Sequence, residues 1–92
     1  MNNKIVSYIG FAIKSGAVVY GADDILKSKK NSGVILYKKD INEKNLNKIK
    51  SKLKIPCLDC DEELTSFEKL SGAKVIFITD KNLSEAIISN AK

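Results

Sequence analysis

Apolar residues recur at helical spacing in five stretches of the chain. Between residues 4 and 14 they fall three or four positions apart, and the pair Ser15-Gly16 that follows is a common helix stop. The same spacing predicts a helix over 42–53, with Leu46, Ile49 and Leu53 facing inward. Further helices are predicted over residues 21–30 and 61–70, and from Asp80 or Asn82 towards the C-terminus.

Four short apolar runs lie between these helices and are typical of strands. Residues 34–37 and 75–78 are continuously apolar, as in strands buried on both faces. Residues 17–20 form a third strand between two glycines, and Pro56 confines the fourth, 55–58, to an edge or a strand start. The alternation predicts one α/β domain over residues 1–92, a three-layer α/β/α sandwich with a four-stranded mixed sheet and about five helices. Residues 34–37 are expected at the sheet's centre.

Two predicted helix boundaries depend on single residues. Asp61 is the expected cap of the fourth helix, because a carboxylate there can accept from free N–H groups of the first turn. Gly33 follows the second helix and suits a left-handed cap at its end.

The charge of the chain is unevenly distributed. All 16 basic residues are lysine and the net charge is +5. Residues 1–54 contain 12 lysines and 4 acids, whereas residues 55–92 contain 4 lysines and 7 acids. This split predicts an electrostatic field that is positive on one side of the molecule, as in proteins that bind phosphate groups. Solvated helix faces in a lysine-rich composition give the same pattern.

No apolar run approaches the roughly 18 residues that a membrane span needs, and no secretory leader is recognisable. We therefore expect a cytoplasmic protein with reduced thiols and no membrane partner.

The segment 21–30, GADDILKSKK, combines a glycine, two carboxylates and a lysine at a predicted helix start. Asp23 and Asp24 lie where they can accept from first-turn N–H groups and favour the positive end of the helix dipole. Lys27 follows one turn later on the same face. Such a helix start can bind a polynucleotide, and it is equally the pattern of a well-capped helix.

Residues 5–37, IVSYIGFAIKSGAVVYGADDILKSKKNSGVILY, resemble the ribosomal L-seven-Ae/L-thirty-e superfamily, most closely its bacterial YlxQ-type members. Residues 72–88, GAKVIFITDKNLSEAII, are similar to the family's closing strand, threonine-aspartate turn and final helix. Together the two matches cover most of the chain. The features that carry the first match are Gly10, the exit Lys14-Ser15-Gly16, the short strand into Gly21, Lys27, and Gly33 before a buried strand.

The resemblance implies a small, non-catalytic RNA-binding protein of ribosomal type that recognises kink-turns, sharply bent duplexes with exposed guanine edges. The family pattern has asparagine and glutamate at the positions of Asp23 and Asp24, between Gly21 and Lys27. A lysine can donate to guanine O6 and N7, and a carboxylate can accept from guanine N–H groups. Here a negative charge replaces the asparagine amide and Asp24 is one methylene shorter than glutamate, so we expect weakened or altered binding.

The expected partner is structured RNA, such as that of the ribosome, bound by a monomer without a cofactor. The expected contacts are Gly21, Ala22, Asp23, Asp24 and Lys27 at the helix start, with Lys14, Lys29, Lys30, Lys38 and Lys39 on phosphates. The family's second contact corresponds to residues 58–63, LDCDEE, whose four acids oppose RNA. The alternative is a diverged module with weak or lost RNA binding, in which these acids meet a basic protein.

Cys57 and Cys60 form a C-x-x-C pair, a spacing found in redox sites and in half of a zinc site. A closed zinc site is not expected, because the chain has no histidine and no third cysteine. The neighbouring acids should raise the pKa of both thiols and oppose a redox role. Without histidine no nucleophile–base pair of the usual sort can form, so no enzymatic activity is expected.

Three tyrosines could stack on unpaired bases. Tyr8 and Tyr37 lie on predicted apolar faces and are expected in the core. Tyr20, next to Gly21, is the one for which stacking on a base is worth testing.

Overall fold

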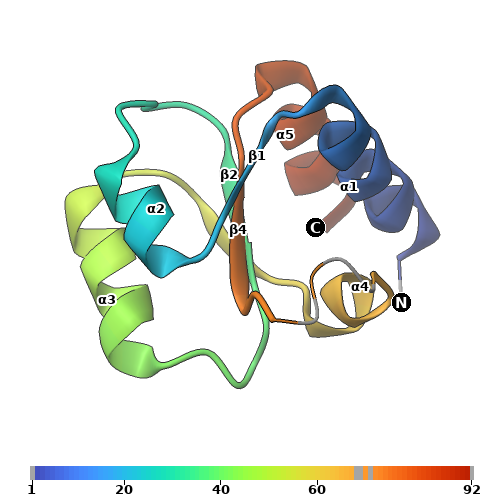
Figure 1. The fold of residues 1–92 in the computed structure, drawn as a ribbon. Helices are drawn as coiled ribbons and strands as arrows, with labels where there is room; N and C mark the ends of the chain where they lie inside the picture. Colours follow the sequence, from blue (N-terminus) through green and yellow to red (C-terminus); the bar gives the residue numbers. More distant parts are fainter. Residues whose placement is uncertain (1, 68–69, 71, 92) are drawn as a thin grey trace.

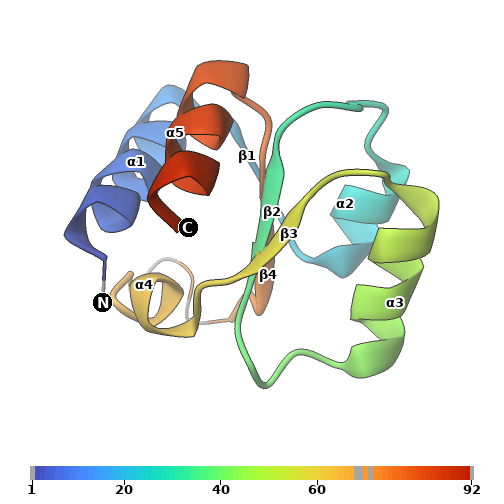
Figure 2. The ribbon, with the colours of Figure 1, turned by 180° about the vertical axis from the view of Figure 1, so that it is seen from behind.

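The computed structural model describes residues 2–67, 70 and 72–91, and it contains a mixed four-stranded sheet between two helical layers (Figures 1 and 2). The strand order is β1 (Val18–Tyr20), β4 (Val75–Ile78), β2 (Val34–Tyr37) and β3 (Cys57–Asp59). β4 is antiparallel to both β1 and β2, and β2 is parallel to β3. The predicted fold class is confirmed, with β2 inside the sheet and the strand after Pro56 at its edge.

The helices divide between the two faces of the sheet. α2 (Ala22–Lys27) and α3 (Glu43–Lys52) cover one face, and α1 (Asn3–Ser15), α4 (Asp61–Thr65) and α5 (Lys81–Ala91) cover the other (Figures 1 and 2). Each layer has its own buried apolar cluster, because alternate residues of β2 and β4 point to opposite faces. The α2–α3 cluster contains Ile25, Ile35, Ile49, Ile55, Val75 and Phe77. The opposite cluster contains Ile5, Ile9, Ala12, Val34, Leu36, Cys60, Leu64, Leu70, Ile76, Ile78 and Ile87.

Three helix ends follow from local hydrogen bonds. The Asn2 side chain caps α1 by accepting from the N–H groups of Lys4 and Ile5, and Gly16, at φ 76°, ends the helix as predicted. At α5 the structure decides between the two predicted caps, since Asp80 Oδ1 accepts from Leu83 N at 3.0 Å.

The second helix is shorter than predicted, ending at Lys27 instead of near Lys30. Ser28 is extended, with ψ 139°, so the chain leaves the helix at this residue. The Nζ of Lys52, on α3, donates to the carbonyl of Leu26 in the last turn of α2. The bond from α3 thus satisfies the Leu26 carbonyl at the end of α2. One further turn of α2 would otherwise have paired this carbonyl with a backbone N–H.

The fourth helix also ends early, at Thr65, although the prediction extended it over residues 61–70. The hydroxyls of Thr65 and Ser66 donate to the carbonyls of Asp61 and Glu63, which are local bonds that compete with helix continuation. Glu68, Lys69 and the predicted stop residue Ser71 lie outside the described residues.

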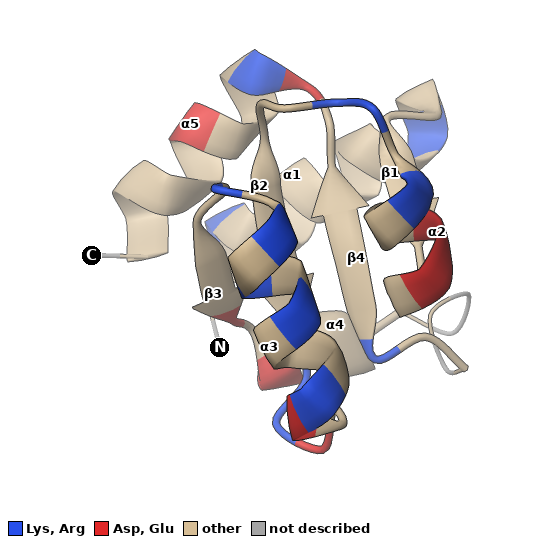
Figure 3. Ribbon diagram, turned by 90° about the vertical axis from the view of Figure 1, so that its left-hand side faces the viewer, with Lys and Arg blue, Asp and Glu red and all other residues tan. Residues whose placement is uncertain are grey.

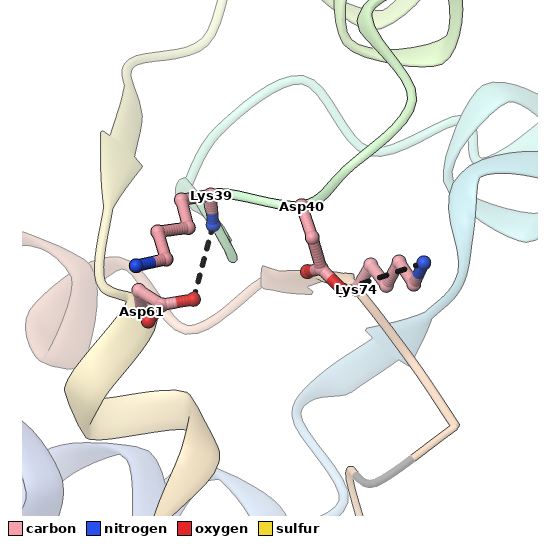
Figure 4. Close-up of polar contacts among 4 residues, drawn as sticks. All are labelled: Lys39, Asp40, Asp61 and Lys74. Atoms are coloured by element: carbon pink, nitrogen blue, oxygen red, sulfur yellow. Dashed lines mark hydrogen bonds and ion pairs between the residues drawn. The ribbon is translucent and has the colours of Figure 1, made fainter.

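The predicted Asp61 cap is wrong. Cys60 occupies the N-cap position of α4 without a side-chain capping bond, and Asp61 is the first helical residue. The Asp61 carboxylate instead accepts from the backbone N–H of Lys39, 3.1 Å away, which ties the loop after β2 to the start of α4 (Figure 4).

Gly33 has a different role from the predicted left-handed helix cap. Its φ is 140°, and it enters β2 where the backbone lies against β4. A Cβ at this position would overlap the carbonyl oxygen of Ile78 and lie 2.8 Å from the Phe77 ring. Glycine is therefore required here by close backbone approach.

Candidate nucleic-acid interface

The carboxyl ends of β1, β2 and β3 lie at the same end of the sheet, because β1 and β2 both run antiparallel to β4 and β3 runs parallel to β2. In open α/β sheets, ligands bind outside the carboxyl ends of the strands. The segments found at this end are the start of α2 after β1, the loop 38–42 after β2, the start of α4 after β3, and residues 72–74 before β4.

The start of α2 is fixed by backbone bonds alone. Gly21, at φ 84°, donates its N–H to the carbonyl of Val75 and accepts from the N–H of Ile25, each at 3.1 Å. No side-chain capping bond forms at this helix start. Asp23 and Asp24 lie in the first turn of α2, as predicted for carboxylates that favour the positive end of the helix dipole, and both are exposed where a ligand can reach them.

A hollow of about 500 Å³ opens beside this helix start. It is lined by Gly21, Ala22, Asp40, Ile41, Asn42, Asn45, Gly72, Ala73, Lys74 and Val75. At its edge the Nζ of Lys74 lies 3.4 Å from the Oδ2 of Asp40, and both side chains are more than half exposed (Figure 4). Backbone of two helix starts, amide side chains and this exposed ion pair give the hollow both donors and acceptors.

The predicted contact residues do not all gather at this end. Gly21, Ala22, Asp23, Asp24, Lys38 and Lys39 lie at the carboxyl end of the parallel strands. Lys27 is exposed at the far end of α2. Lys14, Lys29 and Lys30 precede β1 and β2 and therefore lie towards the opposite end of the sheet. One binding surface around Gly21 thus does not include Lys14 or Lys30.

The uneven charge in the sequence corresponds to the two helical layers. The basic segment 21–54 supplies α2 and α3, and Figure 3 shows lysines along α3 on this side of the molecule. The acids Asp61, Glu62 and Glu63 lie in α4, on the other side of the sheet. The exception is α1, which belongs to the basic half of the sequence but packs with α5.

The lysines of α3 were not among the predicted contacts. Lys44, Lys48 and Lys52, here called the α3 lysine row, are exposed and spaced four residues apart, so they follow one side of the helix. Their spacing was readable in the sequence, but the neighbouring surface was not. Lys50 faces another way, with its Nζ 6.0 Å from the centre of the Tyr37 ring.

The three tyrosines differ in their exposure to solvent. Tyr8 and Tyr37 are half-buried and pack against the two apolar clusters, whereas Tyr20 is 38% exposed beside Gly21. Phe11, which the sequence did not single out, is 59% exposed on α1. It borders a hollow with Lys14 and Leu83, away from the α2–α3 layer.

The C-x-x-C pair lacks the features of a redox site. Burial, helped by the charges of Glu63 and Asp59, raises the pKa of Cys60 to about 12. Burial also raises the pKa of Cys57, against an opposing effect of Lys50. Neither thiol is therefore activated at neutral pH. Among the described residues no three histidine, cysteine, aspartate or glutamate side chains are grouped so that they could hold a metal ion.

None of the helices in the described part of the chain is both long enough and apolar enough to cross a bilayer.

No protein-family model matches the chain, and no curated protein is found to be similar to it. A solved structure described as that of "a protein with unknown function from Bacillus halodurans C" matches it with a TM-score of 0.77. The two chains are 16% identical, and the match covers 98% of each. At this identity the likeness shows the fold alone, so function has to be argued from the site.

Proposed function

We propose that this chain is a small RNA-binding protein without catalytic activity, and that it recognises structured RNA of the kink-turn kind at the start of α2. The observation that carries the proposal is the concentration of lysines on the α2–α3 layer, next to a helix start with exposed polar groups (Figure 3). A basic surface beside a polar edge supplies both phosphate attraction and base recognition.

The charged side chains at both ends of the short helix α2 have roles in this proposal. The carboxylates of Asp23 and Asp24 accept from guanine N–H groups, and Lys27 donates to a base edge or a phosphate. All three side chains are exposed, and no ion pair involving them forms within the described residues. Tyr20, at the end of β1, offers a ring on which an unpaired base can stack.

A filter-binding titration tests the proposal by comparing a kink-turn RNA with the same duplex lacking the kink. We expect tighter binding of the kinked RNA, and affinity for both that falls steeply with salt because lysines displace counterions. Equal, weak binding of the two RNAs would remove kink-turn recognition. Absence of salt-sensitive binding to either RNA would remove RNA binding altogether.

The alternative of a protein-interaction module rests on the acids of residues 59–63, and three of them accept hydrogen bonds within the chain, Asp59 from the backbone N–H of Asp61. Asp61 accepts from Lys39 N, and Glu63 accepts from the backbone N–H of Asn2 at 2.8 Å. The structure thus gives these two carboxylates internal roles that do not require a basic partner. A pull-down whose captured protein survives nuclease treatment would favour the alternative.

A further inference from the structure

A second hollow, of about 530 Å³, lies between α2 and α3 on the basic side of the molecule. Leu26 of α2 contributes to it, and the other lining residues are Asn47, Lys48, Ser51 and Lys52 of α3. The four α3 positions repeat at i, i+1, i+4 and i+5, so one side of the helix forms the wall. We call this hollow, with the α3 lysine row along it, the α2–α3 groove.

The chemistry of the groove selects an anionic occupant. Lys44, Lys48 and Lys52 carry three positive charges over two helical turns, without an acid between them. The acids nearest in the two helices, Glu43, Asp23 and Asp24, are all in first turns. An uncharged helix docked here would cover the ammonium groups without pairing them, which is costly.

The groove is also not simply a charged surface. Its lining is mostly apolar, because Leu26 and the aliphatic stems of the lysines contribute to it. Asn47 and Ser51 add an amide and a hydroxyl, which both donate and accept. A nucleotide has the matching parts: a ribose and base to lie on the apolar lining, a 2′-OH to bond with the amide or hydroxyl, and a phosphate for the lysines.

We propose that the α2–α3 groove holds a flexible single strand of RNA that continues from the structured RNA bound at the start of α2. The inference rests on the proposed function and extends it, because α2 contributes to both surfaces and packs with α3 on the same face of the sheet (Figure 1). Lys44 and Lys48 bind phosphates, and Lys52 does so with the donors that its bond to the Leu26 carbonyl leaves free.

The test uses the full chain and two RNAs, a blunt kink-turn RNA and the same RNA with a single-stranded extension of about ten nucleotides. The extension should increase affinity roughly ten-fold at 0.1 M salt, because it adds at least two phosphate contacts. In the variant Lys44→Gln/Lys48→Gln the gain in affinity from the extension should disappear. The slope of log affinity against log salt concentration for the extended RNA should fall in magnitude by about 1.4, since each single-strand phosphate contact contributes about 0.7. Lys52 is left in place because it also binds α2.

The matched control is Lys4→Gln/Lys81→Gln, which removes the same charge from exposed positions in α1 and α5. It should retain the gain from the extension. A second pair of variants distinguishes an effect at the groove from an effect of net charge. Ser51→Glu places a carboxylate in the hollow and should abolish the gain in affinity, whereas Ser89→Glu, at an exposed position of α5, should not.

Three outcomes would overturn the inference. If the blunt RNA binds but the extension adds nothing, the groove proposal fails while the proposed function stands. If neither RNA binds, both fail. The third outcome is that polyglutamate binds the wild-type protein but not Lys44→Gln/Lys48→Gln, while the single-stranded extension adds nothing to RNA affinity. The occupant of the groove is then an acidic protein segment instead.

Discussion

Cys57 and Cys60 pack on opposite faces of the sheet, although only two residues separate them. Cys57 contacts the cluster beneath α2 and α3, whereas Cys60 is buried in the cluster shared by α1, α4 and α5. Side chains alternate between the two faces along β3, and Cys60, which follows β3 as the N-cap of α4, lies on the face opposite Cys57, so the C-x-x-C spacing here separates the two sulfur atoms. A motif that would bring thiols together in a turn keeps them apart in an extended segment.

We therefore expect no intramolecular disulfide in the folded protein under a glutathione buffer that oxidises exposed dithiols. Mass spectrometry after alkylation should find both cysteines reduced, and both should react once the chain is unfolded in urea. A disulfide-linked monomer that keeps the native circular dichroism spectrum would contradict this.

The burial of Cys60 also predicts a loss of stability in alkali. Its pKa is about 12 in the folded protein against an ordinary value of 9.0, so the folded state favours the protonated thiol. This contribution is complete below pH 9 and is lost as the pH rises from 9 towards 12. Urea unfolding at pH 8 and pH 10.5 should show the decrease in the free energy of unfolding, and Cys60→Ala should show a smaller decrease.

Gly33→Ala should destabilise the fold by more than about 2 kcal/mol, because the new Cβ meets the Ile78 carbonyl at a φ that side chains rarely adopt. The control is Gly72→Ala, where a Cβ has no heavy atom within 4 Å. That change should alter the free energy of unfolding by less than about 1 kcal/mol. Equal urea midpoints for the two variants would show that β2 and β4 can separate to accommodate the methyl group.

Asp23→Asn with Asp24→Glu should raise kink-turn affinity about ten-fold, because an amide donor replaces a charge that faces phosphate and the longer carboxylate reaches further. Lys27→Ala should lower it by a similar factor. Filter binding of the unkinked duplex is the control. A variant that alters only the general electrostatic attraction to RNA would change the affinities for both RNAs alike. No change in either variant would place recognition elsewhere.

The sequence could predict the strands and most helix starts because their signals are local. The runs 34–37 and 75–78 are apolar throughout since both faces of β2 and β4 are buried, and Asp80 caps α5 through a bond to a residue close by. These features are determined by a few adjacent side chains. The fold class followed from their alternation.

The remaining features depend on contacts between distant segments. α2 ends where Lys52 reaches its last turn, and Gly33 is needed because of Ile78 in another strand. The candidate site illustrates the same limit, since Lys14 and Lys30 were grouped by charge but lie far along the sheet from Gly21. Only the packing of α2 against α3 shows which lysines share a groove.

The position of β4 has a consequence for the order in which this protein can fold during synthesis. β1 and β2 both pair with β4, and in register Val18 and Val34 each lie opposite Ile78. β4 lies between β1 and β2 in the sheet but follows both of them in the chain. Until β4 has been made, β1 has no partner strand, and its pairing with β4 joins segments far apart in the chain, which is slow. We conclude that β1 joins β2 and β3 in one sheet only after β4 has been synthesised.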